Sequence, residues 1–406
     1  MIKANNVPRL RFPGFTDAWE YRKLGDIAIT YSGGTPAIGN RDYYIGNIPF
    51  IRSGEISKTK TELCISSEAI KNSSAKMIKS GDILYALYGA TSGEVSRAKL
   101  DGAINQAVLA IILNPVNDSD FVVEWLRKEK NNIISTYLQG GQGNLSAHIV
   151  KQFILTLANK FEQKKIGTFF SKLNSLITLH QDKIEAIKKY KTGMLQKMFP
   201  REGETVPEIR FPGFTGEWEE KRLEDYLEVS NEKNEHKAFS KEDVLSVSGE
   251  YGVVNQIEFQ GRSFAGKSVV NYGIIKTGYV VYTRSPLKSN PYGIIKTNKG
   301  KPGIVSTLYA VYKNKGNGDP NFIQVYFEQD TRTNNYLRPL INKGAKNTIQ
   351  VSPENALKGK IIFPSKEEQQ KIAIFFQALD NLISFHQREY DKLKELKKGL
   401  LQQMFV

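Results

Sequence analysis

The stretch EQKKIGTFFSKLNSLITLHQDKIEAIKKYKTGMLQKMF, residues 162–199, has a close counterpart, EQQKIAIFFQALDNLISFHQREYDKLKELKKGLLQQMF, at residues 368–405. The two stretches align without a gap, and 18 of their 38 positions are identical. Neither stretch contains proline, and both are rich in Lys, Glu, Gln and Leu, which favour helices. The sequence therefore predicts two long helices that descend from one duplicated segment.

Apolar residues recur in both stretches at alternating steps of four and three. This is the spacing of a coiled-coil seam, so we expect a helix–helix and partner interface there. The residues with this spacing are Ile166, Phe170, Leu173, Ile177, Ile372, Phe376, Leu379 and Ile383. Each seam is interrupted by a His and a Lys, namely His180, Lys191, His386 and Lys397. Polar residues on a seam can fix the register of pairing. Metal binding by the two histidines is the alternative, although no Cys or acidic cluster joins them at ligand spacing.

A second duplication precedes each helix. VPRLRFPGFTDAWE at 7–20 returns as VPEIRFPGFTGEWE at 206–219, with ten of fourteen positions identical. The order of RFPGF motif, variable region and long segment therefore occurs twice. Two equivalent halves related by a two-fold axis would make the helices antiparallel. At about 1.5 Å per residue, such helices would hold the variable regions apart at a fixed distance.

The variable regions, roughly 21–155 and 220–361, have a different composition from the helices. They are rich in β-branched and aromatic residues punctuated by glycine, as in GDILYALYG from 81 and GYVVYTRSP from 278. This composition is typical of strands, and the helical stretches are short. We predict the α+β class, with two α+β domains separated by two long antiparallel coiled-coil helices in a pseudo-two-fold repeat.

Charge and cysteine content narrow the class of partner. The formal net charge is +15, and residues 259–318 contain no Asp or Glu but ten Lys or Arg and six Tyr. A polyanion, nucleic acid before membrane, is the expected partner, and a solvated basic face is the alternative. The sequence has no long apolar run or secretory signal, and its single cysteine, Cys64, can form no internal disulfide. We therefore expect a cytoplasmic protein.

Catalytic motifs are weak in this sequence. GRSFAGKS at 261–268 fits the P-loop pattern, but strand-like residues follow it where a P-loop needs a helix. Asn290-Pro291-Tyr292 resembles the adenine methyltransferase signature but lacks one proline, and no glycine-rich cofactor loop accompanies it. A nuclease centre needs clustered acids for a metal ion, and the four histidines are scattered. We therefore expect a binding protein without a catalytic centre or metal of its own.

The duplicated RFPGF motif and the duplicated EQxKIxxFFxxLxxLI helix resemble the specificity subunits of type I restriction–modification systems. The resemblance covers essentially the whole chain, and FPSKEEQQKIA at 363–373 is especially typical of the family. It implies a first target-recognition domain at 1–155, a long helix at 156–200, a second target-recognition domain at 201–361 and a second long helix at 362–406.

The resemblance further implies a subunit that does no chemistry. Each domain would read one half of a bipartite, gapped, asymmetric sequence of double-stranded DNA, and the helices would set the gap. The subunit would recruit two adenine-N6 methyltransferase subunits and the restriction subunits, which are motor-nucleases. It would bind no cofactor itself, because S-adenosylmethionine, ATP and Mg²⁺ would belong to those partners.

The family's domains vary too much for base contacts to be carried over, so we choose candidates by chemistry. Donors and aromatic rings in turn-like, glycine-rich stretches suit base edges and phosphates. In the first domain these are Arg41, Tyr43, Tyr44, Arg52, Tyr88, Thr91, Ser92, Arg97, Gln139, Gln142 and Asn144. In the second they are Arg262, Lys267, Arg284, Ser285, Lys288, Asn290, Tyr292, Lys346, Asn347 and Gln350.

Two other function classes stay open from the sequence. One is a stand-alone sequence-specific DNA-binding or scaffold protein without methyltransferase partners. The other is a nucleotide-dependent enzyme that uses the P-loop-like segment. Neither explains why the RFPGF motif and the helix are both duplicated.

Overall fold

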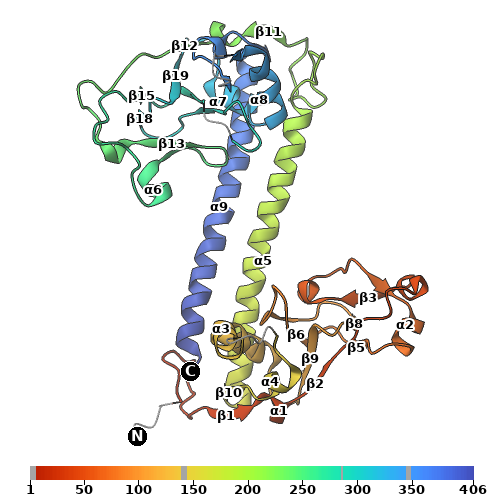
Figure 1. Ribbon diagram of the computed structural model, residues 1–406. Helices are drawn as coiled ribbons and strands as arrows, with labels where there is room; N and C mark the ends of the chain where they lie inside the picture. Colours follow the sequence, from red (N-terminus) through yellow and green to blue (C-terminus); the bar gives the residue numbers. More distant parts are fainter. Residues whose placement is uncertain (1–5, 139–143, 285–286, 344–348) are drawn as a thin grey trace. The chain divides into compact units, whose positions relative to one another are not determined.

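The computed structural model describes residues 6–138, 144–284, 287–343 and 349–406 (Figure 1). The chain forms two compact units, Met1–Asp182 with Gln387–Val406, and Lys183–His386. The predicted long helices are confirmed as α5 (Lys160–Lys197) and α9 (Lys366–Met404), and each contributes to both units. Within the described ranges, none of the helices is long and apolar enough to cross a membrane.

The first unit carries two four-stranded sheets. One has the order β2-β9-β6-β7 with antiparallel pairing throughout, and the other has the order β4-β3-β8-β5 with β3 and β8 parallel. The strands are β2 (Ala28–Ser32), β3 (Ile48–Ile51), β4 (Cys64–Ile65), β5 (Lys76–Ile78), β6 (Ile83–Ala86), β7 (Val95–Arg97), β8 (Gly102–Ile104) and β9 (Val108–Leu113). The helices are α1 (Leu24–Ile27), α2 (Ser67–Lys71), α3 (Ser119–Tyr137) and α4 (Ala147–Lys151), with 3-10 turns η1 (Arg41–Tyr44) and η2 (Ser53–Glu55). A separate antiparallel pair joins β1 (Glu20–Lys23) to β10 (Ile154–Leu157).

The second unit repeats the first of these sheets, with the order β12-β19-β16-β17. Its strands are β12 (Leu227–Val229), β16 (Val280–Thr283), β17 (Ile295–Thr297) and β19 (Tyr309–Asn314). The antiparallel pairs are β11 (Glu219–Arg222) with β22 (Lys360–Phe363), β13 (Leu245–Ser248) with β14 (Gly252–Asn255), β15 (Gly273–Ile275) with β18 (Gly303–Val305), and β20 (Asn342–Lys343) with β21 (Ile349–Gln350). The helices are α6 (Gln256–Gln260), α7 (Pro320–Tyr326) and α8 (Asp330–Leu337), with 3-10 turns η3 (Leu223–Asp225), η4 (Lys241–Asp243), η5 (Arg338–Leu340) and η6 (Asn355–Leu357). The α+β class and the internal repeat are thus confirmed.

An aromatic cluster, the first aromatic box, holds the first unit to its helices. It consists of Trp19, Phe121, Phe170 and Phe405, all buried. The ring centroids of Phe405 lie 6.1, 5.0 and 5.8 Å from those of Trp19, Phe121 and Phe170. Aromatic pairs at these separations contribute beyond the area that they bury. The box therefore joins residues from both ends of the chain.

The second unit builds the same arrangement, the second aromatic box, from Phe199, Trp218, Phe322 and Phe376. The centroid of Phe199 lies 5.8, 5.6 and 6.3 Å from those of Trp218, Phe322 and Phe376. Each member corresponds in place to one member of the first box. The duplicated letters W, FF and MF in the sequence thus recur because they fill the same aromatic core.

A buried ion pair joins each RFPGF motif to the start of a long helix. In the first unit Arg11 donates from Nε and Nη2 to the two carboxylate oxygens of Glu162, at 2.8 and 2.7 Å. In the second unit Arg210 makes the same bidentate contact with Glu368, both distances being 2.8 Å. Both glutamates are buried, where a bidentate guanidinium contact satisfies the carboxylate best.

Each RFPGF motif also contacts the end of the other long helix. The backbone N–H of Leu10 donates to the Gln403 carbonyl near the end of α9, at 2.9 Å. The N–H of Ile209 makes the equivalent bond to the Lys197 carbonyl at the end of α5, also 2.9 Å. The first motif therefore bonds to the end of α9, which is distant from it in the sequence. The second motif bonds to the end of α5, which it follows directly in the sequence.

The glutamine next to each buried glutamate fixes the domain helix. Gln163 Oε1 accepts from the backbone N–H of Asp118, the N-cap of α3, at 3.0 Å. Gln369 accepts in the same way from Asp319, the N-cap of α7, at 3.0 Å. The EQ pair at the start of each long helix thus connects it to both the RFPGF motif and the domain.

Helix α5 contains a glycine in its interior, Gly167, and the surroundings of this residue explain why. A Cβ at this position would lie 2.1 Å from Oδ1 of Asp118, which caps α3 by accepting from the Phe121 N–H. Glycine costs about 1 kcal/mol relative to alanine inside a helix. The close approach of α3 to α5 requires it here.

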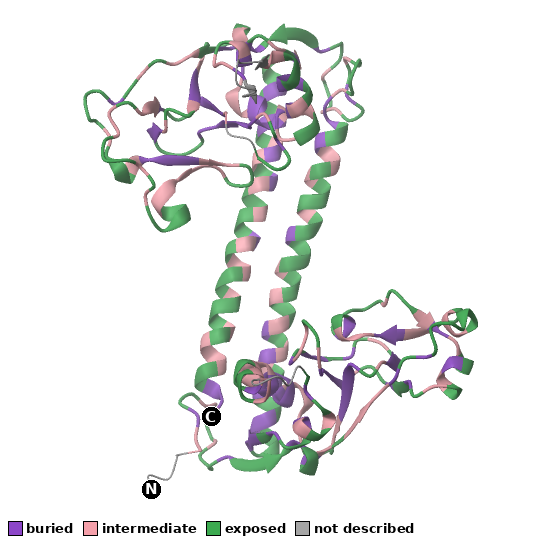
Figure 2. Ribbon diagram, viewed as in Figure 1, coloured by how far each residue is buried: buried purple, intermediate pink, exposed green. Residues whose placement is uncertain are grey.

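The predicted seam is only partly a helix–helix contact. The buried positions of α5 and α9 concentrate near the helix ends, where the domains pack (Figure 2). In the middle turns, which the structure describes in full, only Ile184 and His386 are buried. Ile166, Phe170 and Leu173 belong to the core of the first unit, and Ile372, Phe376 and Leu379 to that of the second. Their side chains are used inside the chain, which leaves no surface on them for a partner. Ile177 and Ile383 are partly buried.

Candidate nucleic-acid interface

Turn η1 carries three of the predicted contacts of the first unit. Asn40 caps this turn by accepting from the Asp42 N–H, which leaves Arg41 exposed. Tyr43 and Tyr44 are partly buried against a small apolar core, and the Tyr44 hydroxyl donates to the Pro36 carbonyl at 2.8 Å. Arg41 is therefore the most accessible of the three to a phosphate or base edge.

Two arginines of the first unit are already paired. Arg52 lies 3.0 Å from Glu55 and 2.5 Å from Glu62, and hydrogen bonding to these two carboxylates raises its pKa. Arg97 donates to Asp120 at 3.1 Å and to the Gly81 carbonyl at 3.0 Å. Contact of either arginine with DNA would compete with these bonds.

The structure brings together four other predicted residues of the first unit. Tyr88 forms an isolated antiparallel bridge with Asn144. Thr91 and Ser92 lie in the turn between β6 and β7, where the Ser92 N–H donates to the Gly89 carbonyl at 3.1 Å. Gly93 ends the turn with a φ of 78°, a left-handed conformation that favours glycine. Partly exposed donors thus cluster at one end of this sheet.

In the second unit Arg262, Lys267 and Lys288 are exposed. The Arg262 guanidinium stacks on the ring of Phe264, 4.6 Å from its centroid. The P-loop-like segment at 261–268 follows helix α6, and the next element is strand β15. This is the reverse of the strand-loop-helix order that a P-loop requires, so the structure removes the support for nucleotide hydrolysis.

Two predicted residues of the second unit are engaged in the fold. The Arg284 guanidinium donates to the carbonyls of Leu308 and Thr307, at 3.1 and 2.9 Å. Asn290 is buried, and its Nδ2 donates to Asp330 at 2.6 Å. This burial contradicts the choice of Asn290 as a DNA contact, because only 5% of the residue is exposed. Tyr292 packs partly against the main core of the unit.

Six of the predicted DNA contacts remain. Gln350 lies in β21. The others lie outside the described residues and are Gln139, Gln142, Ser285, Lys346 and Asn347.

The seam lysines form partly buried ionic clusters. Lys191 lies 2.6 Å from Glu328 and 2.5 Å from Asp380, and these three residues are the second lysine cluster. Burial alone would lower the pKa of Lys191, but the two carboxylates outweigh burial and raise it. Lys191, which interrupts the apolar seam, therefore forms ion pairs, one of them with Glu328 of the adjacent domain.

The first unit has a similar cluster around Lys397, the first lysine cluster, which contains one carboxylate fewer. Lys397 lies 2.9 Å from Glu124 and donates to Asn174 Oδ1 at 2.7 Å. Asn174 occupies the place of Asp380, so one carboxylate faces this lysine instead of two, and burial lowers the pKa of Lys397. Glu124 also pairs with Arg127.

No group of three His, Cys, Asp or Glu residues that could hold a metal ion occurs in the described part of the chain. The His180 side chain lies near enough to Glu389 to help lower the pKa of that carboxyl, after the larger effect of Lys392.

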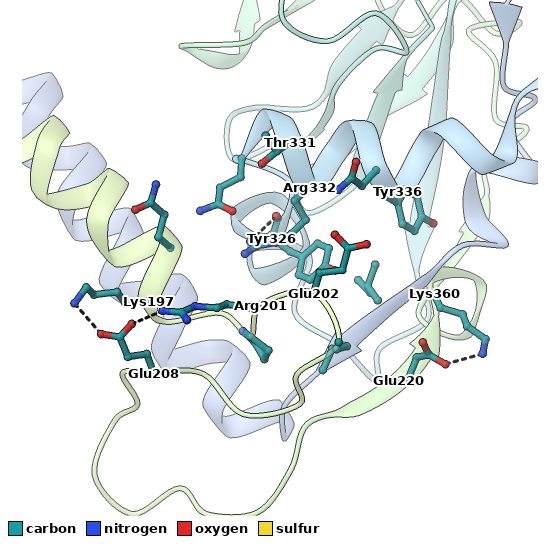
Figure 3. A pocket seen from close by; sticks show the side chains of 17 residues that line it. Lys197, Arg201, Glu202, Glu208, Glu220, Tyr326, Thr331, Arg332, Tyr336 and Lys360 are labelled. Atoms are coloured by element: carbon teal, nitrogen blue, oxygen red, sulfur yellow. Dashed lines mark hydrogen bonds and ion pairs between the residues drawn. The ribbon is translucent and has the colours of Figure 1, made fainter.

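A cavity of about 760 Å³ lies in the second unit, between the last turn of α5, α8 and β22 (Figure 3). The Arg332 guanidinium stacks there on Phe199 and Tyr326, 4.7 and 4.9 Å from their ring centroids. It also donates to the Tyr326 carbonyl at 3.1 Å, and burial lowers the pKa of Arg332.

The lysines at the rim of this cavity are paired with glutamates. Lys197 pairs with Glu208 at 2.8 Å, and Lys360 pairs with Glu220 at 2.6 Å (Figure 3). None of the predicted DNA contacts lines the cavity. The cavity is therefore separate from the candidate interface.

A sequence model described as "Type I restriction modification DNA specificity domain" matches residues 16–189 and, a second time, residues 215–395. The chain belongs to this family. It is thus a type I specificity subunit with two target-recognition domains, and such subunits are the non-catalytic components of restriction–modification complexes.

Relatives of this specificity subunit match along nearly its whole length. The MjaX specificity subunit of Methanocaldococcus jannaschii is 25% identical over 430 residues, which cover 98% of this chain and 95% of its own. The MjaVIII specificity subunit of the same organism is 22% identical over 97% of this chain and 92% of its own. The crystal structure of a type I S subunit from M. genitalium shares the fold, with a TM-score of 0.67 and 14% identity over 98% of this chain and 99% of that chain.

Sequence reasoning missed the acidic partners in this specificity subunit. Glu124 and Glu328 contact the seam lysines. Glu124 stands in the apolar stretch FVVEWL of α3, and Glu328 follows α7 in FIQVYFEQ. For Glu124 the available signal was a charge inside an apolar helical stretch, because such a charge needs a counter-ion. The Arg–Glu pairs were also visible as duplicated letters.

Proposed function

We propose that this specificity subunit reads a bipartite, gapped and asymmetric target in double-stranded DNA, one half with each target-recognition domain. The duplicated frame supports this proposal. The two aromatic boxes and the two Arg–Glu pairs match position by position, and each seam lysine faces a glutamate of its own domain. The exposed candidates differ, with Arg41 in one domain and Arg262 and Lys267 in the other. Two domains that share their core contacts but differ in their exposed residues suit two unlike half-sites.

The gap between half-sites would follow from the two long helices. A helix rises about 1.5 Å per residue, and ten base pairs of DNA span about 34 Å. Helices of 38 and 39 residues can therefore set a fixed number of unread base pairs between the domains.

Recruitment of two identical methyltransferase subunits would use surfaces that also occur twice. Each unit exposes about half of three apolar side chains on its helix segments. They are Leu176, Leu179 and Leu396 in the first unit, and Leu382, Phe385 and Tyr190 at the equivalent positions of the second. Two matching apolar sets suit two copies of one partner.

The chemistry would come from these partners. The methyltransferase subunits would carry S-adenosylmethionine and methylate adenine N6. The motor-nuclease subunits would add ATP, Mg²⁺ and cleavage. The whole complex would act on DNA in the cytoplasm.

The test is selection of DNA by the complex purified with its methyltransferase subunits. From a random duplex library we expect enrichment of two short unlike motifs at one fixed spacing. A single continuous motif, or two motifs at variable spacing, would contradict the proposal. The matched variants Leu176→Asp and Leu382→Asp should each lose one methyltransferase subunit from the complex, as native mass spectrometry would show.

A further inference from the structure

The second target-recognition domain exposes an aromatic group that its core does not use. Tyr251, Phe259 and Phe264 keep 57%, 46% and 56% of their surface exposed. The rings of Tyr251 and Phe259 contact each other, with centroids 5.4 Å apart. Clustered exposed aromatic side chains cost solvation free energy unless a partner covers them.

The loop that carries Phe264 is built to hold the ring outward. Helix α6 ends at Gly261, whose φ of 74° turns the chain away from the helix. The Phe264 N–H donates to Gln256 Oε1 at 2.7 Å, and Gln256 Nε2 donates to Ser246 Oγ at 3.1 Å. Because Ser246 is a buried residue of β13, the loop is tied to the sheet. The position of Phe264 is thus fixed before any partner arrives.

The charges around this ring identify the class of partner. Arg262 stacks on Phe264, and Lys267 lies three residues beyond the ring; in the described ranges neither cation has a carboxylate partner. Of the two nearest acids in the sequence, Glu250 is paired with Lys188 at 3.2 Å and Glu258 is exposed. From 259 to 318 the sequence has ten cations and no acid, and of these Lys276 and Lys313 pair with Glu232. Aromatic rings among unpaired cations suit nucleic acid, whose bases stack and whose phosphates are anionic.

We propose that Phe264 inserts at a base step of the half-site that the second domain reads, while Arg262 neutralises the adjacent phosphate. This inference rests on the proposed function and adds a residue to it. Apolar side chains that enter a base step unstack it partly, and a nearby cation offsets the backbone charge. Phe264 would then contribute specificity, because flexible steps such as TA open more easily than others.

The experiment uses the complex with methyltransferase subunits and a duplex that carries its selected target. 2-Aminopurine replaces adenine at successive positions of both half-sites, and its fluorescence rises where a base is unstacked. We expect a rise at one step of the second half-site, at least a two-fold loss of that rise in Phe264→Ala, and its retention in Phe264→Leu. Phe161→Ala removes an exposed ring from the first unit and should leave the signal unchanged.

The arginine is tested by the dependence of binding on salt. Arg262→Ala should weaken binding about ten-fold at both matched and mismatched targets and lower the salt slope by about one, since one phosphate contact is lost. Arg262→Lys should restore the slope.

The outcomes separate this inference from the function on which it rests. If the wild-type complex selects no split target, the proposed function fails. If it selects a split target but fluorescence rises nowhere in the second half-site, or equally in Phe264→Ala, the insertion is overturned and the function stands. Loss of the signal in both Phe264→Ala and Phe161→Ala would also overturn it, because the signal would then reflect assembly.

Discussion

At the scale of single residues, the two lysine clusters differ in charge, because Asn174 stands in the first where Asp380 stands in the second. Lys191 faces two carboxylates, whereas Lys397 faces Glu124 and the amide of Asn174. Breaking a buried pair is costly because it leaves a charge without its partner. The cost therefore depends on what each lysine leaves behind.

We expect Lys191→Met to destabilise the second unit by about 3–5 kcal/mol, because two carboxylates lose their shared cation. Lys397→Met should cost the first unit only about 1–3 kcal/mol, since Glu124 keeps its pair with Arg127. Urea unfolding followed by hydrogen exchange of peptides from each unit measures both effects. Equal costs in the two units would show that the second carboxylate contributes nothing.

The two clusters should also respond oppositely to alkaline pH. The pKa of Lys191 is raised, so its stabilisation is fully present below its unfolded pKa and is lost as pH rises through the higher folded pKa. The pKa of Lys397 is lowered, so the unfolded chain binds more protons between the two pKa values and stability rises with pH there. Comparing the pH dependence of wild type with that of each Lys→Met variant isolates these contributions. Asp380→Asn should make Lys191 behave like Lys397, and an unchanged profile in that variant would refute the charge argument.

At the scale of elements, each long helix is held at its ends by an aromatic box and an Arg–Glu pair. Phe405 and Phe199 occupy the same place in the two boxes. Both are buried, so truncation to alanine removes the same ring from the same surroundings.

We expect Phe199→Ala and Phe405→Ala each to cost about 3–5 kcal/mol, and each to act on its own unit. Hydrogen exchange should show lost protection in the second unit for Phe199→Ala and in the first for Phe405→Ala. Loss spread equally over both units in either variant would mean that the boxes are not separate cores.

The helices give a second prediction if they set the gap. Four added residues lengthen a helix by about 6 Å and rotate it by about 40°, close to the twist of one base pair. The added rise equals nearly two base pairs and the added rotation equals the twist of one. Insertion of four residues after Asp182 in α5 and after Arg388 in α9 should therefore lengthen the selected gap by one or two base pairs and leave both half-sites unchanged. An unaltered gap would contradict the role of the helices. Insertion in one helix alone is the control and should prevent assembly.

The sequence predicted these elements well and their contacts poorly. Repetition revealed both helices, because the identical letters had no other explanation. The seam residues were assigned to helix pairing, and the clusters that contain Phe170 and Phe376 hold residues of the other long helix as well as domain residues. Periodicity identifies the apolar face of a helix but not what covers it. Asn290 was misplaced for a related reason, since a polar residue in a turn can be buried when another side chain accepts from it, as Asp330 accepts from Asn290 Nδ2.

At the scale of the whole molecule, the two units share their core contacts and differ in their exposed residues. The frame contacts recur residue by residue, while the exposed cations and aromatic rings do not. Such a chain suits one complex of identical partners on a target whose halves differ. The family match supports this account, and the base contacts are proposals that rest on exposure and charge.

The most direct test is a genome-wide map of N6-methyladenine in the source cell, with the gene intact and deleted. The account predicts that deletion removes methylation from one motif made of two unlike halves at a fixed gap, and that reintroducing the gene restores it. Survival of that methylation after deletion, or loss of methylation from an ungapped motif, would contradict it.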